Sequence, residues 1–245
     1  MANPTLEPLA PVIIRRDVEI HRQLLEGRLH AARLHFSYGT YQDPANMGIG
    51  PLRVFNHETF PEAARLAPHP HSHAQLITYV VAGELEHSDA ELDAGRIGAG
   101  GVQRSTLSSG ADDLEWNPSS TEPLELLHIR LALRREPQLL VEQRQYHLDE
   151  RSNRWLRIAR PHGESGGGVA VDSDASVHVS HLEPAASVGH TIAPGHGGYA
   201  YVISGGAELN GHRLGSGDAA LITGAGIVHV EAGQPAELIL VDTAL

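Results

Sequence analysis

The chain has 245 residues, enough for one large or two ordinary domains, and its formal charge is −12, from 18 Lys and Arg against 30 Asp and Glu. An acidic chain repels phosphate backbones, so direct nucleic-acid binding is not expected. There is no cysteine, which excludes disulfides and thiolate sites, so any metal must be held by oxygen donors or by some of the 17 histidines.

The composition favours an all-β protein. The chain contains 26 Gly and 15 Pro but only 4% aromatic residues, and many short apolar runs are separated by turn residues. The N-terminus lacks a basic segment followed by an apolar core, and no apolar run approaches the roughly 20 residues of a membrane span. We therefore expect a cytoplasmic protein without a membrane segment.

The first half of the chain contains several predicted strands, identified by alternating or continuous apolar residues. They lie at residues 12–14, 34–39, 52–56, 76–81, 84–87 and 124–133. Residues 134–146 are polar and interrupted by proline, so we expect a loop or a helical turn there. The predicted domain boundary lies in this segment, which gives domains at 1–135 and 136–245.

The second half repeats the pattern of the first. The run at 199–205 is similar to the run at 78–83, and both end in glycine. Asn210-Gly211 is a strong signal for a two-residue hairpin turn. This self-similarity at domain length predicts two β-barrels in tandem.

Two pairs of possible metal ligands occur in the first half, His69 with His71 and Asp113 with Glu115. Residues i and i+2 of a strand project from the same face, so each pair can point to one place. Two imidazoles and two carboxylates suit a divalent transition metal. Taken singly, each pair is more often a solvated or hydrogen-bonded pair, but the apolar run at 76–81 places the histidines beside a buried strand. His73 is the substitute ligand.

These segments resemble the pirin family, a branch of the two-domain cupins. The resemblance is carried by residues 36–39, 43–50, 52–56, 68–71 and 77–89, and more weakly by the second half. It implies two tandem cupin barrels, each a double-stranded β-helix or jelly roll. It also implies one metal ion, usually iron, in the N-terminal barrel, held by the two histidines of H-P-H and a later H-x-E.

The resemblance implies that His69, His71, Asp113 and Glu115 hold this metal ion, with Fe expected and Mn, Ni, Cu, Zn or Co as alternatives. Glu115 matches the family pattern and would also act as general base, whereas Asp113 stands where the family has histidine. A second carboxylate lowers the charge of the centre from about +1 to about zero. We therefore expect a poor flavonol dioxygenase that the substitution Asp113→His would improve.

The second half contains Val228-His229-Val230-Glu231, which is similar to the family's H-x-E segment. No H-x-H lies at the matching distance before it, and His190 and His196 are not spaced for one strand face. We therefore expect a metal-free C-terminal barrel with a structural His229, and a second metal site is the alternative.

Three functions remain open from the sequence. The first is a quercetin 2,3-dioxygenase-type oxygenase that acts on a small, flavonol-like aromatic substrate. The second is a non-catalytic, metal- or redox-responsive regulatory protein with a protein partner, as some pirins are. The third is a barrel that has lost its metal site.

Overall fold

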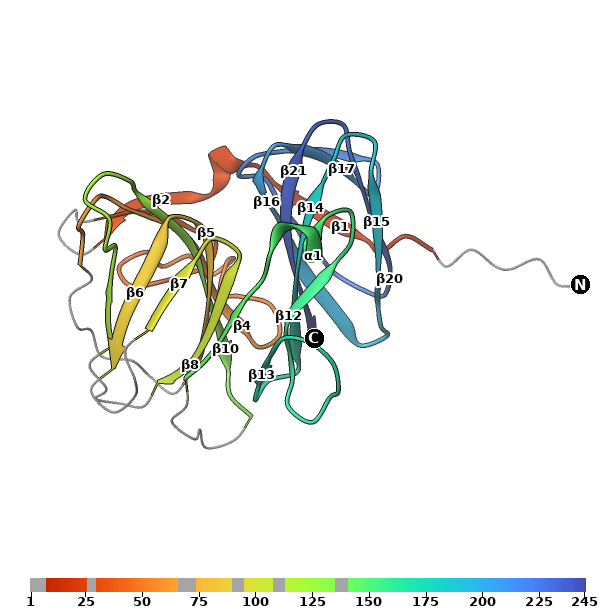
Figure 1. Ribbon diagram of the computed structural model, residues 1–245. Helices are drawn as coiled ribbons and strands as arrows, with labels where there is room; N and C mark the ends of the chain where they lie inside the picture. The colour runs from red at the N-terminus through yellow and green to blue at the C-terminus, as the bar shows by residue number, and fades with distance from the viewer. Residues whose placement is uncertain (1–7, 26–29, 66–73, 90–94, 108–112, 135–140) are drawn as a thin grey trace, which may run out of the picture. The chain divides into compact units, whose positions relative to one another are not determined.

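The computed structural model describes residues 8–25, 30–65, 74–89, 95–107, 113–134 and 141–245, which are almost entirely β-strands (Figure 1). The one α-helix among them, α1 (Leu148–Arg151), is a single turn, and a short 3₁₀ helix, η1, covers Asp17–Glu19. Within these residues no helix has the length and apolar character needed to cross a membrane.

The N-terminal barrel consists of a seven-stranded sheet and a three-stranded sheet among the described residues. The larger sheet has the order β11-β8-β5-β10-β4-β3-β2, and the smaller sheet has the order β7-β6-β9. Their bounds are β2 (His21–Leu25), β3 (His30–Leu34), β4 (Leu52–Phe60), β5 (Ala74–Ala82), β6 (Glu84–Asp89), β7 (Gly95–Gly98), β8 (Gly101–Leu107), β9 (Asp113–Trp116), β10 (Leu124–Ala132) and β11 (Val141–Gln145).

The C-terminal barrel is built mainly from strands of two further sheets, a seven-stranded sheet with the order β1-β19-β16-β21-β14-β12-β13 and a four-stranded sheet with the order β15-β20-β17-β18. Their bounds are β1 (Val12–Arg15), β12 (Leu156–Pro161), β13 (Val169–Val171), β14 (Ala175–Leu182), β15 (Ser187–Ile192), β16 (His196–Ser204), β17 (Gly206–Leu209), β18 (His212–Gly215), β19 (Ala219–Ile222), β20 (Gly226–Ala232) and β21 (Ala236–Ala244). The predicted all-β class is confirmed.

The chain folds into two compact units, and each unit is made of segments that alternate along the sequence. One contains Ile20–His147 and Ile158–Ala175, and the other contains the described residues up to Glu19 together with Leu148–Arg157 and Ser176–Leu245. The predicted division into 1–135 and 136–245 cuts the chain once, whereas each of these units contains more than one segment. The strand β1 belongs to the second unit because it pairs antiparallel with β19, with Val12 opposite Ile222.

The segment at 134–146 differs from the expected loop or helical turn. Residues Val141–Gln145 form β11, which pairs antiparallel with β8 so that Gln143 lies opposite Gln103. The prediction was wrong because polarity was used to identify a loop, and a strand at the edge of a sheet can be polar on its exposed face.

The repeat between the two halves is visible at one glycine in each barrel. Gly83 separates β5 from β6 with φ +81°, and Gly205 separates β16 from β17 with φ +77°. A Cβ at Gly83 would meet the carbonyl oxygen of Pro123 at 2.7 Å, and a Cβ at Gly205 would collide with the carbonyl oxygen of Pro235. Both glycines therefore allow the chain to turn left-handed against nearby backbone, just before β10 in one barrel and just before β21 in the other.

The predicted hairpin at Asn210-Gly211 is also confirmed. Leu209 pairs with His212, and the two turn residues have φ +47° and +83°. Positive φ at both central residues is the mark of a type I′ turn. A Cβ at Gly211 would meet nothing within 4 Å, so this glycine is needed for its backbone angle alone.

Gly205 and Gly211 form a matched pair that tests the close approach of the Pro235 carbonyl to Gly205. Gly211→Ala should cost about 1–2 kcal/mol, because alanine is strained at positive φ. Gly205→Ala should cost about 1–3 kcal/mol more, because the carbonyl of Pro235 must also move. Urea unfolding of both variants measures the difference, and equal losses would show that the contact with Pro235 does not constrain the turn.

Candidate metal centre

The interior of the N-terminal barrel is apolar at one part and polar at another. Its apolar part is a cluster that includes Phe60, Leu85 and Leu126. Because side chains two residues apart share a strand face, the face of β4 that carries Phe60 also carries Glu58, and the face of β10 that carries Leu126 also carries His128. The inward faces of β4 and β10 therefore carry both the apolar cluster and, next to it, a group of buried polar residues.

Three of these polar side chains form a chain of contacts. Nδ1 of His128 lies 3.4 Å from Oε1 of Glu58, and Nε2 of His128 lies 3.4 Å from Oε2 of Glu115. Glu58 and Glu115 are each 3% exposed and His128 is 7% exposed, so all three are withdrawn from water. The side-chain amide of Asn56 donates a hydrogen bond of 3.0 Å to Glu58.

The two carboxylates change the titration of the imidazole. Burial opposes the charged form of His128, but the negative charges of Glu58 and Glu115 more than offset it and raise the pKa of His128 to about 10. In the metal-free protein the imidazole therefore carries a proton at neutral pH and compensates part of the buried negative charge.

A second imidazole lies close to Glu115. His87 of β6 is directly opposite Glu115 of β9 and is 1% exposed. Its Nε2 contacts the side-chain amide of Gln143, which donates a hydrogen bond of 2.9 Å to Gln103. The amide of Gln143 comes from β11, the strand that the sequence did not predict.

The structure describes only some of the predicted ligands. His69, His71 and the substitute His73 lie outside the described residues. Asp113 is the first residue of β9 and pairs with Asp89 of β6, and Glu115 lies two residues further along the same strand. Whether these residues share one metal ion stays a prediction. Within the described ranges no three His, Asp or Glu side chains are arranged to hold a metal ion by themselves.

The donor set that is described fits a divalent cation. Glu115 is a buried carboxylate, and burying a carboxylate is costly unless a positive charge or several hydrogen bonds compensate it. Its Oε2 lies 3.4 Å from Nε2 of His128, and carboxylate and imidazole are the donors that first-row metals use in the absence of cysteine. Glu115 and His128 could thus form one side of such a centre.

The sequence did not identify His128, Glu58 or His87 as site residues. The available signal was a polar residue on the inward face of an otherwise apolar strand, as at His128 after Leu124 and Leu126. Alternation along one strand shows which face a residue takes, but it does not show which residues of other strands it meets.

The C-terminal barrel also collects histidines at one place. Asp242 of β21 accepts hydrogen bonds from Nε2 of His190 at 2.7 Å and from Nδ1 of His196 at 2.9 Å. These histidines come from β15 and β16, so their spacing in sequence did not predict the contact. His178 packs against His190 with ring centroids 4.6 Å apart, and burial lowers the pKa of His178 to about 3.

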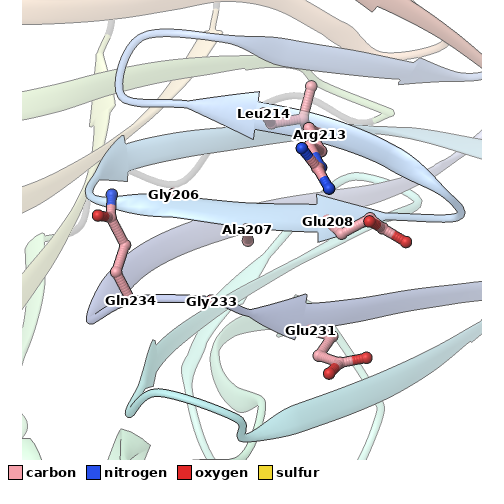
Figure 2. Close-up of a pocket in the computed structure, with 8 residues that line it drawn as sticks. All are labelled: Gly206, Ala207, Glu208, Arg213, Leu214, Glu231, Gly233 and Gln234. Atoms are coloured by element: carbon pink, nitrogen blue, oxygen red, sulfur yellow. The ribbon is translucent and has the colours of Figure 1, made fainter.

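The histidine and the glutamate of the H-x-E segment in this barrel project from the exposed face of β20. Val228 and Val230 of β20 belong to the apolar core, whereas His229 and Glu231 are exposed. The segment does not direct its side chains into the barrel. A hollow of about 450 Å³ lies over the same sheet and is lined by Glu208, Arg213 and Glu231 (Figure 2). It belongs to a different unit from Glu115, so it is not part of the candidate centre.

The hydrogen bonds to Asp242 give a pH-dependent expectation. Burial alone raises the pKa of Asp242, but the hydrogen bonds from His190 and His196 outweigh burial and lower it. Their stabilisation is therefore present above the unfolded pKa of about 3.9 and is lost as pH falls through the lower folded value. Asp242→Asn should cost about 1–3 kcal/mol at pH 7.

Denaturation of both Asp242→Asn and the unchanged protein, at pH 7 and in acid, measures this effect. The difference in the free energy of unfolding between the two proteins should be smaller in acid than at pH 7. Glu231→Gln is the control, because it removes one negative charge from the exposed face of the same barrel. A loss of stability that is the same at both pH values would contradict the role of the carboxylate charge.

Both halves of the chain match known families. Residues 17–130 match the family described as Pirin, and residues 143–243 match the quercetinase C-terminal cupin domain. A pirin-like protein from Caulobacter vibrioides is 30% identical over 215 residues, which cover 87% of this chain and 92% of the relative. The quercetin 2,3-dioxygenase of Escherichia coli K12 is 28% identical over 207 residues, covering 84% and 88%.

A comparison of the fold with solved structures also finds a pirin. The crystal structure of the bacterial pirin YhhW from Escherichia coli in complex with nickel(II) superposes with a TM-score of 0.86 at 25% identity, covering 96% of this chain and 99% of that one. The resemblance inferred from the sequence motifs is confirmed. The chain belongs to the pirin family, and its fold is that of two tandem cupin barrels.

Proposed function

We propose that this pirin is a metal-dependent oxygenase of the quercetin 2,3-dioxygenase type, with its centre inside the N-terminal barrel. His69, His71 and Glu115 hold one divalent metal ion, and Asp113 is the fourth candidate donor. The observation that carries the proposal is the buried carboxylate of Glu115, which lies on the inner side of the barrel beside His128. A relative that bears the dioxygenase name and another that binds nickel(II) support it.

The substrate is a small aromatic compound of the flavonol type, and iron is the expected metal. When bound, the metal supplies Lewis-acid stabilisation of a deprotonated hydroxyl group. Glu115 accepts the hydroxyl proton as the substrate binds, and the apolar cluster further along the same strands makes the adjoining interior non-polar. A cytoplasmic location belongs to the same proposal.

The second candidate is a non-catalytic regulatory protein that binds a metal and a protein partner. The observation that favours it is Asp113, which stands at the position of the family's third histidine. Both candidates share the metal centre, so metal analysis alone does not separate them, whereas oxygen consumption with quercetin does.

The first test removes the charge of Glu115. Glu115→Gln should lower the affinity for iron by more than about tenfold and abolish oxygen uptake with quercetin, because an amide is a poorer ligand and no base. Glu86→Gln is the control, since Glu86 lies on the neighbouring strand but pairs with Arg96 at 2.6 Å. Full oxygen uptake by Glu115→Gln would exclude this residue from the centre.

The second test concerns Asp113. Asp113→His removes one negative charge from the region of the centre, so a bound metal attracts an anionic substrate more strongly and acidifies it further. We expect tighter metal binding and faster turnover of quercetin than in the unchanged protein, with both forms loaded with iron in the same way. If neither rises, Asp113 lies away from the metal or the barrel does not serve this reaction.

A further inference from the structure

We infer that His128 is a ligand of the same metal ion as Glu115, oriented from behind by Glu58. This inference rests on the proposed metal centre and adds a donor that sequence patterns did not assign. It would provide the third imidazole that the chain lacks at position 113, from β10 instead of β9.

The first argument is the distance between the two donor atoms. Two donors that each lie about 2.1 Å from one ion, at an angle of about 90–110°, are about 3.0–3.4 Å apart. Nε2 of His128 and Oε2 of Glu115 are 3.4 Å apart. This separation lies at the upper end of that range, so one cation can lie between the two atoms.

The second argument is the group behind the imidazole. Histidines that bind metals usually donate their other ring N–H to a carboxylate or a carbonyl, which fixes the ring and the tautomer. The other nitrogen of His128, Nδ1, faces Oε1 of Glu58 at 3.4 Å. Asn56 in turn donates a hydrogen bond of 3.0 Å to the same oxygen. This arrangement leaves Nε2 directed toward Glu115.

The third argument is burial. Glu58 and Glu115 are both 3% exposed and His128 is 7% exposed, so the two carboxylates and the imidazole between them are withdrawn from water. Nearby positive charge stabilises buried carboxylates, and a divalent cation between His128 and Glu115 would supply it.

A neighbouring histidine shows that burial beside a carboxylate is not sufficient. His57 is 2% exposed and its Nε2 lies 2.6 Å from Oε1 of Glu125, which is a hydrogen-bond distance. It lies between Asn56 and Glu58 on β4, so it points to the opposite face of the strand. His57 is therefore a matched control for a buried imidazole outside the centre.

The experiment uses Co(II) as the probe, added to the metal-free full-length protein. Visible absorption measures affinity and geometry, and X-ray absorption counts the imidazole ligands. His128→Gln should lose one imidazole, change the Co(II) spectrum and bind about tenfold more weakly or worse. His57→Gln should leave the spectrum, the imidazole count and the affinity unchanged.

Glu58→Gln keeps His128 but removes the carboxylate behind it. It should weaken Co(II) binding about tenfold while the number of imidazole ligands stays the same. Circular dichroism and thermal unfolding of each variant show whether the barrel is intact. If His128→Gln fails to fold, the affinity of folded Glu58→Gln for Co(II) still tests the inference.

Three results would overturn the inference. If folded His128→Gln keeps the spectrum and imidazole count of the unchanged protein, His128 is not a ligand, although the centre itself stands. Folded Glu58→Gln that binds Co(II) as tightly as the unchanged protein removes the orienting role of Glu58. If the unchanged protein binds no Co(II), the proposed function loses its metal centre as well.

Discussion

The cost of burying a carboxylate inside a β-barrel is the constraint on which the rest of the N-terminal site depends. Glu115 cannot lie 3% exposed without compensation, and the barrel provides it through residues on other strands. His128 comes from the central strand β10, which is flanked by β5 and β4 and therefore has little freedom to shift. The position of the imidazole is thus fixed by a ladder on each side.

The two barrels use the same fold for different interiors. The N-terminal barrel holds Glu58, His128 and Glu115 next to an apolar cluster, so its interior combines charge with exclusion of water. The C-terminal barrel has an apolar core of its own, and its carboxylate Asp242 accepts hydrogen bonds from two histidines. The two hydrogen bonds stabilise the charge of the buried Asp242 carboxylate.

The sequence predicted the fold well and the site only in part. The hairpin at Asn210-Gly211 and the glycine shared by the two halves were readable because each depends on a local backbone angle that few residues adopt. Asp113 and Glu115 could be paired from the sequence because their motif lies within one strand, and their role as metal ligands stays a prediction. His128 and Asp242 could not be paired with their partners, since those partners lie on other strands, and pairing between strands depends on register and sheet order. The strand β11 was missed because its edge position permits polar residues.

The pairing of β1 with β19 has a consequence for how the protein is made. Val12 lies opposite Ile222, so the first strand of the chain completes a sheet whose other strands are among the last to be synthesised. At translation rates of about 5–20 residues per second, β1 waits about 10–40 seconds for its partner. During that time the apolar segment Val12-Ile13-Ile14 has an unpaired backbone edge, and such edges associate readily with other strands. The apolar segment at residues 12–14 is therefore open to association with other strands until β19 has been made.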